Sequence, residues 1–342
     1  MVGVSETLWR NPTSSYIRIL TKEIGVQSHR CSLPLQRSIS DYGFDKSFKD
    51  SAKSILEHLG FEIPLSTVAA VTREHAEKIA RRQQATCTDA NALPSVGVEE
   101  LVAEADGSFI RIVSTTVGKA DARKTRKVDY KEARLFASSA QGSNFVCYDA
   151  TFGPVDTGAA LWAQTAKSVG MSIDSYVQVI ADGARWIDSQ RIIAFADQGD
   201  LLIDLYHVLE YISAASETCS DKAKRWVKTQ KNRLKKGRSD QVIEALKKHL
   251  EPEDLPDEVC PVRCAWRYLD NRSDYLAYDK AIEKEMPLGS GLIESGNKHV
   301  LQARMKIPGA SWSIETAENF ARTRAMRSNG QWNTYWSELS AA

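Results

Sequence analysis

Three acidic residues have the types and settings that metal-dependent phosphoryl transfer requires. Asp106 in EADGSFIRI and Asp182 in VQVIADGARWI each end an apolar, strand-like run, whereas Glu294 in PLGSGLIESGNKH lies where a helix is expected to begin. Carboxylate oxygens are the ligands that Mg²⁺ prefers, and two-metal sites hold their ions about 3.5–4 Å apart, so several convergent acids must balance the charge. A single Asp-Gly pair is usually only a turn. The ordered set of three therefore predicts a Mg²⁺ or Mn²⁺ site at which these acids are both catalytic residues and metal ligands.

Three further residues are auxiliary or alternative candidates. Asp204 and His207 in LIDLYHVLEY are three residues apart, so they could share one helical face and bind a metal or orient a phosphate and water. The same pair is equally typical of an ordinary helix. Asp149 in CYDATF replaces Asp106 if the strand order differs from the expected one. We expect the acids to be functional, because a chain without catalysis has no physical reason to keep three buried, mutually repelling carboxylates.

Other common catalytic motifs are missing from the sequence. The chain has no Walker A loop, G-x-S-x-G elbow or H-E-x-x-H helix. Cys260 and Cys264 lack a second Cys/His pair of zinc-site spacing, which favours two ordinary semi-buried thiols. The six cysteines are scattered, and this is typical of a reducing compartment rather than a disulfide framework.

A basic stretch stands out in a chain of net charge +1: residues 220–240 carry nine Lys/Arg against two Asp. Such a run is often only a solvated helix face, but this density favours a surface that follows phosphates. The predicted DNA-binding residues are Lys222, Lys224, Arg225, Lys228, Lys231, Arg233, Lys235, Lys236 and Arg304. A second cluster and the C-terminal arginines could extend this surface: Lys119, Arg123, Lys124, Arg126, Lys127, Arg322, Arg324 and Arg327.

The helices and strands that must position these residues can be predicted from sequence patterns that differ along the chain. Residues 1–44 are left unassigned. Residues 45–86 predict two helices, the first with apolar residues at helical spacing and stopped by Gly60, the second beginning near Pro64. The apolar positions are Phe48, Ala52, Ile55, Leu56 and Leu59 in the first helix and Val68, Val71, His75 and Ile79 in the second. This outline fits a DNA-binding helix-turn-helix or an ordinary helical hairpin.

The rest of the chain predicts an α/β core followed by helices. Residues 100–208 alternate strands and helices around a mixed sheet, residues 209–286 are helical and highly charged, and residues 287–342 form a C-terminal helical part that carries Glu294. The chain of 342 residues shows neither a signal peptide nor an apolar stretch of membrane-spanning length. We therefore expect a cytoplasmic protein.

Several of these stretches resemble bacterial insertion-sequence DDE transposases of the ISKra group, relatives of the mutator-type enzymes. The resemblance covers roughly residues 41–337 and is most specific at GSGLIESGNKH with its downstream Trp. The matching stretches are DYGFDKSFKDSA, ADGSFIRI, IADGARWI, LIDLYHVLEYISAA, GSGLIESGNKHVLQARMK with the following SW, and RAMRSNGQWNTYW. Relatives often carry a Cys-rich zinc-binding segment before the helix-turn-helix, whereas Cys31 stands alone here. This difference predicts a truncated or divergent copy.

The resemblance implies an RNase H-like mixed sheet with flanking helices, an N-terminal helix-turn-helix and an all-helical insertion at 209–286. It places Asp106 on the first core strand, Asp182 on the fourth and Glu294 on the C-terminal helix. Two Mg²⁺ or Mn²⁺ ions would act in cutting and rejoining double-stranded DNA at element ends and target. We expect a homodimer, since two ends must be held together, and association with the nucleoid when DNA is bound. The alternatives are a DNA-binding relic without catalysis and an RNase H-like nuclease without strand joining.

Overall fold

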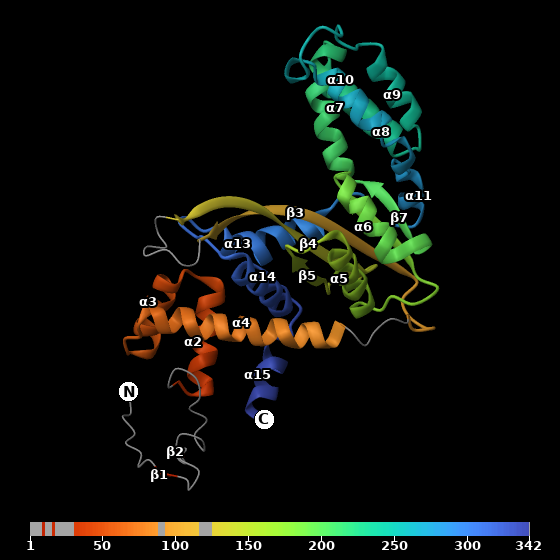
Figure 1. The fold of residues 1–342 in the computed structure, drawn as a ribbon. Coiled ribbons are helices and arrows are strands. Elements are labelled where there is room, and N and C mark those ends of the chain that lie inside the picture. The colour runs from red at the N-terminus through yellow and green to blue at the C-terminus, as the bar shows by residue number, and fades with distance from the viewer. Residues whose placement is uncertain (1–8, 11–15, 18–30, 88–92, 116–124, 342) are drawn as a thin grey trace. The chain divides into compact units, whose positions relative to one another are not determined.

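The computed structural model describes residues 9–10, 16–17, 31–87, 93–115 and 125–341 (Figure 1). The chain forms two compact units. The helical unit comprises Met1–Asn91, Ser108–Ala133 and Lys298–Ala342, and the sheet unit comprises Ala92–Gly107 and Arg134–Asn297. Within the described ranges, no helix is both long and apolar enough to cross a membrane.

A five-stranded mixed sheet, in the order β5-β4-β3-β6-β7, forms the core of the sheet unit. Its strands are β3 (Glu100–Ser114), β4 (Lys127–Ala140), β5 (Cys147–Thr151), β6 (Tyr176–Ala181) and β7 (Gly199–Ile203). β6 pairs in parallel with both β3 and β7, whereas β5 is antiparallel to β4. Gln141, just after β4, donates its N–H to the carbonyl of Glu100 at the start of β3 over 3.0 Å, so these two strands also run in opposite directions.

Two helices make the crossovers that the parallel strands need. α5 (Val155–Ser168) connects β5 to β6, and α6 (Arg185–Phe195) connects β6 to β7. The fully buried Trp162 of α5 packs against the rings of Phe136 and Phe195. β6 is buried along nearly all of its length, as expected for a central parallel strand. The mixed α/β sheet with flanking helices expected from the sequence is confirmed.

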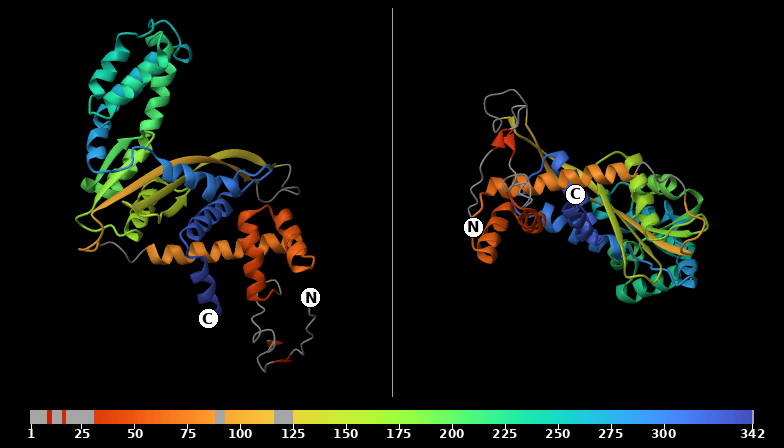
Figure 2. Two further views of the ribbon diagram at one scale, coloured as in Figure 1. Left: turned by 180° about the vertical axis from the view of Figure 1, so that it is seen from behind. Right: turned by 90° about the horizontal axis from the view of Figure 1, so that it is seen from below.

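Helices follow β7, and the last of them in the sheet unit are the short α11 (Tyr278–Glu283) and α12 (Gly291–Gly296). The four before them pack side by side (Figure 2): α7 (Leu205–Cys219), α8 (Ala223–Leu234), α9 (Ser239–Lys247) and α10 (Pro261–Asp270). Ile212, Leu234, Leu246, Val262 and Leu269 form their shared apolar core. The highly charged segment is therefore a packed helical layer with charged residues on its outside.

The helical unit is built on α2 (Leu33–Asp45), α3 (Phe48–Leu59) and α4 (Leu65–Cys87), to which α13 (Ala303–Met305), α14 (Ile314–Ser328) and α15 (Trp332–Ala341) are added. The hydroxyl of Ser47 accepts the N–H of Asp50 and caps α3, and Gly60 ends it with a φ of 74°. The segment 1–44, left unassigned from the sequence, contains all of α2 except its last residue, Asp45.

The apolar positions of α4 are buried as the sequence predicts: Val68, Val71, His75 and Ile79. The stripe of α3 is packed only in part, because Leu56 and Leu59 are each 44% exposed whereas Ile55 is fully buried. The two helices joined by a Gly-containing turn are present.

Candidate active site

An acidic cavity of about 220 Å³ lies in the sheet unit. Its acidic lining residues are Asp106, Asp182, Asp204, Glu210 and Glu294, and His207, Tyr206 and Ser290 also contribute to its wall. All three acids singled out from the sequence thus line one cavity, together with the auxiliary pair Asp204 and His207. Five carboxylates around so small a volume give the cavity a negative charge and the type of oxygen donor that a divalent cation takes.

The strand registers bring three of these acids to the same level. β3 pairs Glu104 with Ile180 of β6, and β6 pairs Ala181 with Ile203 of β7. Continued along the strands, these registers place Asp106 beside Asp182 and Asp182 beside Asp204. Asp106, however, does not end a strand: it lies within the 15-residue β3, which continues to Ser114. The expectation of a strand end was wrong at this position, because the alternating pattern of FIRIV carries the strand past Gly107.

The turn that carries Asp182 is held by groups from α10 and the residues after it. Oδ1 of Asp182 accepts the N–H of Ala184 over 2.9 Å. The hydroxyl of Tyr268 donates to the carbonyl of Asp182 over 2.6 Å, and Nη2 of Arg272 donates to the carbonyl of Gly183 over 3.0 Å. Gly183 has a φ of 83°, and a Cβ there would lie 2.2 Å from Nε of Arg272. The helical layer therefore positions this acid, and Gly183 permits the close contact.

Asp204 connects the start of α7 to the start of α12 and does not lie on a face of either helix. It is 3% exposed and is the N-cap of α7, where Oδ1 accepts the N–H of Tyr206 over 2.6 Å and that of His207 over 3.3 Å. Its Oδ2 accepts the N–H of Ser290 over 2.8 Å and also the hydroxyl of Ser290. The expected shared helical face with His207 is wrong, because Asp204 precedes the helix. It instead fixes the start of α12, which carries Glu294.

His207 lies on the first turn of α7 at the wall of the cavity. Its Nδ1 is 3.3 Å from a carboxylate oxygen of Glu210. The imidazole ring also meets the rings of Tyr211 and Tyr268 edge-on, with centroids 5.5 Å and 5.6 Å away. These contacts set the orientation of the ring at the cavity.

A buried carboxylate, Glu104, anchors α12 from the sheet. It lies two residues before Asp106 on β3, hence on the same face of the strand, and is fully buried. Oε2 accepts the N–H of Ile293 over 2.8 Å, whereas Oε1 has no hydrogen-bond partner among the described residues. Burial, with smaller contributions from the charges of Asp204 and Glu294, raises the pKa of Glu104 to about 8 against the opposing effect of the Ile293 N–H. At neutral pH the group is therefore mainly protonated.

Asn297 connects the end of α12 to the strand acid. Its side-chain Nδ2 donates to Oδ2 of Asp106 over 2.5 Å. Gly296 just before it allows this approach, since a Cβ there would lie 2.6 Å from the ring of Tyr148. Asn297 is the C-cap of α12, which carries Glu294, so this hydrogen bond fixes Asp106 relative to the helix of Glu294.

The three acids differ in exposure from what the sequence led us to expect. Asp182 and Glu294 are exposed and Asp106 is half-buried. The argument from three buried, mutually repelling acids is therefore wrong: the cavity opens to water, which screens the carboxylates. The fully buried acids are Asp204 and Glu104, and both are used to hold α12.

The ligand chemistry of the cavity fits a divalent cation, but its present geometry does not close around one. Carboxylates are the donor set that Mg²⁺ or Mn²⁺ takes. In the part of the chain that the structure describes, however, no three His, Cys, Asp or Glu side chains converge closely enough to hold an ion. Of the cavity-lining carboxylates that the sequence predicted, Asp106, Asp182 and Glu294 are the ones that could hold an ion, because Asp204 is already engaged by four donors.

Two alternatives raised by the sequence lie away from this cavity. Asp149 is on β5, paired with Phe136 of β4, and does not line the cavity. Cys260 is buried and accepts from Nη2 of Arg263 over 2.5 Å, and Cys264 contacts the carbonyl of Asp257 at 3.5 Å. These contacts agree with ordinary thiols rather than zinc ligands.

Most of the predicted basic surface lies on α8 and its two ends. The exposed members are Lys222, Lys224, Arg225, Lys228, Lys235 and Lys236, while Lys231 and Arg233 are half-buried. Nζ of Lys231 lies 5.8 Å from the ring centroid of Tyr206, which lines the acidic cavity. The basic helix therefore reaches the edge of the candidate site. Of the second cluster, Lys119, Arg123 and Lys124 lie outside the described residues.

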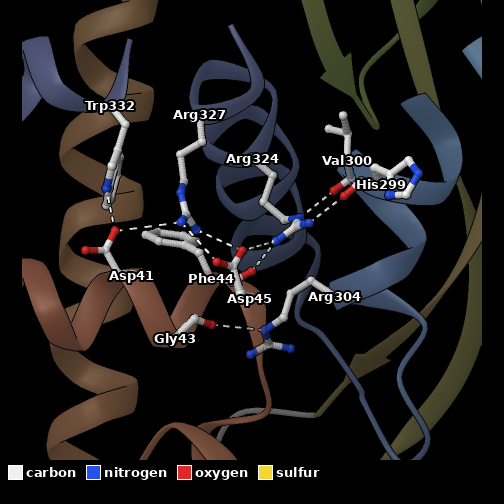
Figure 3. Close-up of polar contacts among 10 residues, drawn as sticks. All are labelled: Asp41, Gly43, Phe44, Asp45, His299, Val300, Arg304, Arg324, Arg327 and Trp332. Carbon is white, nitrogen blue, oxygen red and sulfur yellow. Dashed lines mark hydrogen bonds and ion pairs between the residues drawn. The ribbon is translucent and has the colours of Figure 1, made fainter. Parts of the chain in front are cut away.

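The C-terminal arginines do not extend an exposed surface. Arg304 and Arg324 are 3% and 9% exposed in the helical unit. Arg324 donates to the carbonyls of His299, Val300 and Phe44, and both it and Arg327 pair with Asp45 (Figure 3). The expectation of an exposed surface was wrong for these residues, because Arg304 on α13 and Arg324 on α14 are buried and bind backbone carbonyls. Arg324 and Arg327 hold α14 against the end of α2.

Comparisons with known proteins give little further information. No protein-family model matches the chain, and no curated protein matches it. A crystal structure of NurA bound to dAMP and manganese is 13% identical over 77% of this chain and 63% of that one, with a TM-score of 0.12. A further NurA structure is 12% identical over 79% of this chain and 65% of that one, with a TM-score of 0.11. This chain thus spans less than two thirds of either, and similarities at this level support no conclusion about fold or activity.

Proposed function

We propose that this chain is a DDE-type transposase of the ISKra group that cuts and rejoins DNA by two-metal phosphoryl transfer on an RNase H-like core. The observation that carries the proposal is the common level of Asp106 on β3 and of Asp182 and Asp204, the first residues after the parallel strands β6 and β7. Glu294 reaches the same cavity from α12. A sheet whose first three strands are antiparallel, followed by two parallel ones on its other side, is the arrangement expected of such a core.

The chain's own residues account for the positioning that phosphoryl transfer needs. Asp204 and Glu104 fix the N-terminal end of α12, Asn297 fixes Asp106, and Tyr268 fixes the turn of Asp182. The exposed carboxylates of Asp182 and Glu294 face the cavity from opposite elements. When bound, divalent ions would activate the attacking oxygen and neutralise charge on the transferred phosphoryl group. On this proposal, Asp106, Asp182 and Glu294 hold those ions.

DNA binding is assigned to α8 and to the α3–α4 pair. The exposed lysines and arginines of α8 can follow a phosphate backbone, and Lys231 brings this surface to Tyr206 at the cavity. In the helical unit, α3, the turn at Gly60 and α4 have the outline of a helix-turn-helix. In this assignment, the helices between β7 and α12 are the insertion that both supplies basic residues and clamps Asp182.

Strand joining separates the transposase from its alternatives. DNA carrying the flanking element ends would be incubated with the chain and Mn²⁺, and products would be resolved by length. Joined products support the transposase. Cut but unjoined DNA supports an RNase H-like nuclease, and binding without cutting supports a DNA-binding relic; either of these results contradicts the proposal.

A further inference from the structure

A second cavity, of about 580 Å³, lies entirely within the helical unit. Its lining includes two arginines and no acidic residue. The polar and aromatic part of the wall is formed by Ser47, Phe48, Arg73, Arg304, Trp312 and Ser313. A cavity with this lining has a positive charge that no carboxylate in its wall offsets.

Arg304 at this cavity is used differently from the other buried arginine of the unit. Its Nε donates to the carbonyl of Gly43 over 3.0 Å, and in Figure 3 this is the dashed line that reaches it. Its two terminal nitrogens have no hydrogen bond or ion pair to any residue that the structure describes. Arg324, by contrast, donates to the carbonyls of Val300, His299 and Phe44. Arg304 is 3% exposed, and its two terminal guanidinium nitrogens therefore remain available to hydrogen-bond a ligand in the cavity.

Aromatic rings hold this guanidinium in place. Its central carbon lies 4.8 Å from the ring centroid of Trp312, 5.0 Å from that of Phe48 and 5.5 Å from that of Phe320. Burial lowers the pKa of Arg304 to about 10, with Arg324 acting in the same direction and Asp45 opposing. The group therefore remains charged at neutral pH, and stacking supports that charge without occupying its terminal nitrogens.

Neighbouring groups add to the positive character of the cavity. Arg73 is exposed on α4, and its guanidinium carbon lies 5.6 Å from the ring centroid of Phe48. Ser47 and Ser313 are the N-caps of α3 and α14, so the positive ends of two helix dipoles meet the wall. Two acids stand just outside the wall: Asp50 accepts the hydroxyl of Ser47 over 2.6 Å, and Glu315 is in the first turn of α14.

We propose that this cavity is a phosphate-binding site in which Arg304 supplies a buried fork and Arg73 a second, exposed cation. The ligand is a phosphate group, either free or as a phosphodiester of bound nucleic acid. A planar fork fixed by three rings is suited to two oxygens of one phosphate, which a lysine at this position would not match. The site uses none of the carboxylates of the acidic cavity, so it does not depend on the proposed transposase activity.

The test measures binding of inorganic phosphate to the full chain by isothermal titration, at an ionic strength held constant with sodium chloride. The variant Arg73→Gln changes an exposed lining residue and should leave the fold intact. Arg81→Gln is the matched control, since Arg81 is an exposed arginine of the same helix away from the cavity. We expect saturable binding that weakens about tenfold in Arg73→Gln and in Arg304→Lys, but not in Arg81→Gln.

A second arm uses a short DNA duplex with the same variants and separates the two sources of phosphate. If inorganic phosphate binds and Arg73→Gln weakens it selectively, the site takes free phosphate. If inorganic phosphate fails to bind but duplex affinity falls about tenfold in Arg73→Gln and not in Arg81→Gln, the site takes a phosphodiester. Equal effects of the two variants in both arms, or no effect in either, would overturn the proposal.

Discussion

Asp182 and Asp204 stand at the same level of two adjacent parallel strands. β6 pairs Ala181 with Ile203 of β7, and the N–H of Asp204 donates to the carbonyl of Ala181 over 2.8 Å. One of the two acids is exposed and faces the cavity, and the other is buried and bonded to the start of α12. Neighbouring strand ends thus provide one acid that is exposed at the cavity and one that is bonded into the structure.

The buried role of Asp204 can be tested by stability. Asp204→Ala removes the acceptor of the Tyr206, His207 and Ser290 N–H groups, and we expect it to lower the free energy of unfolding by about 2–3 kcal/mol. Asp204→Asn keeps one acceptor oxygen and should cost less. Urea denaturation in the presence of a chelator measures this without a metal contribution. The exposed Asp174→Ala is the control, and a loss no larger than that of the control would contradict the role.

The hydrogen bond from the Tyr268 hydroxyl to the carbonyl of Asp182 gives a separate prediction. Tyr268→Phe removes the hydroxyl that donates to the Asp182 carbonyl and leaves the ring stacked on Tyr211. We expect metal-dependent cleavage to fall about 10-fold or more with little change in stability, as when a group that orients a ligand is lost. Tyr275→Phe, whose hydroxyl reaches only Asp188 at 3.5 Å, should cleave normally. Equal activity of the two variants would argue against positioning by Tyr268.

Because His75 is buried, we predict that the stability of the helical unit depends on pH. It is fully buried between the hydroxyl of Tyr335 and the amide oxygen of Gln36. Burial lowers its pKa from 6.5 to about 4, with Lys78 acting in the same direction and Glu74 opposing. The unfolded chain therefore protonates His75 more readily, so the stability that His75 contributes is fully present above pH 6.5 and is lost as the pH falls toward 4.

The expected loss across this range is about 3 kcal/mol. Chemical denaturation at a series of pH values measures it: the difference in unfolding free energy between the unmodified chain and His75→Gln should change by this amount between pH 6.5 and 4, because the opposite trend from Glu104 is common to both. The exposed His58→Gln serves as the control and should keep the dependence of the unmodified chain. A curve for His75→Gln that matches the control would contradict the assignment.

The salt dependence of DNA binding tests whether the basic residues of α8 contact DNA phosphates. Each phosphate that the protein neutralises contributes a slope of about −0.9 to the plot of log affinity against log salt concentration. Changing Lys228, Lys231 and Lys235 to Gln should make that slope shallower by roughly 2–3. A triple change of equal charge at the exposed Lys247, Lys248 and Lys280 should alter it less. If both triples change the slope equally, α8 is not the DNA-binding face.

Local patterns in the sequence predicted much of the fold. Gly60, Ser47 and the apolar spacing of α4 define their helices through interactions within a few residues. β6 and β7 were predictable because a buried parallel strand is a short apolar run. The helix α2 was not predicted, because its sequence contains Gly43, where a Cβ would lie 2.1 Å from the hydroxyl of Thr72. A tertiary contact, rather than helix propensity, explains that residue.

The acids that line the candidate site could be predicted from the sequence, but the residues that hold those acids in place could not. Glu104, Ser290 and Tyr268 act through contacts that span 86 to 189 residues of sequence. One signal was available: Glu104 precedes Asp106 by two, which puts it on the same face of the strand. The burial of Arg304 could not be read from the sequence, because the rings that enclose it come from α3, α14 and the loop at Trp312.

The most direct test of the central claim is Mn²⁺-dependent DNA cleavage by the unmodified chain and by Asp182→Asn, Glu294→Gln and Asp149→Asn. Asp149 is the matched control, since it is a strand carboxylate outside the cavity. We predict that Asp182→Asn and Glu294→Gln each reduce cleavage about 100-fold or more and that Asp149→Asn leaves it unchanged. Cleavage that survives both cavity substitutions, or that is lost equally in Asp149→Asn, would contradict a catalytic role for the acidic cavity.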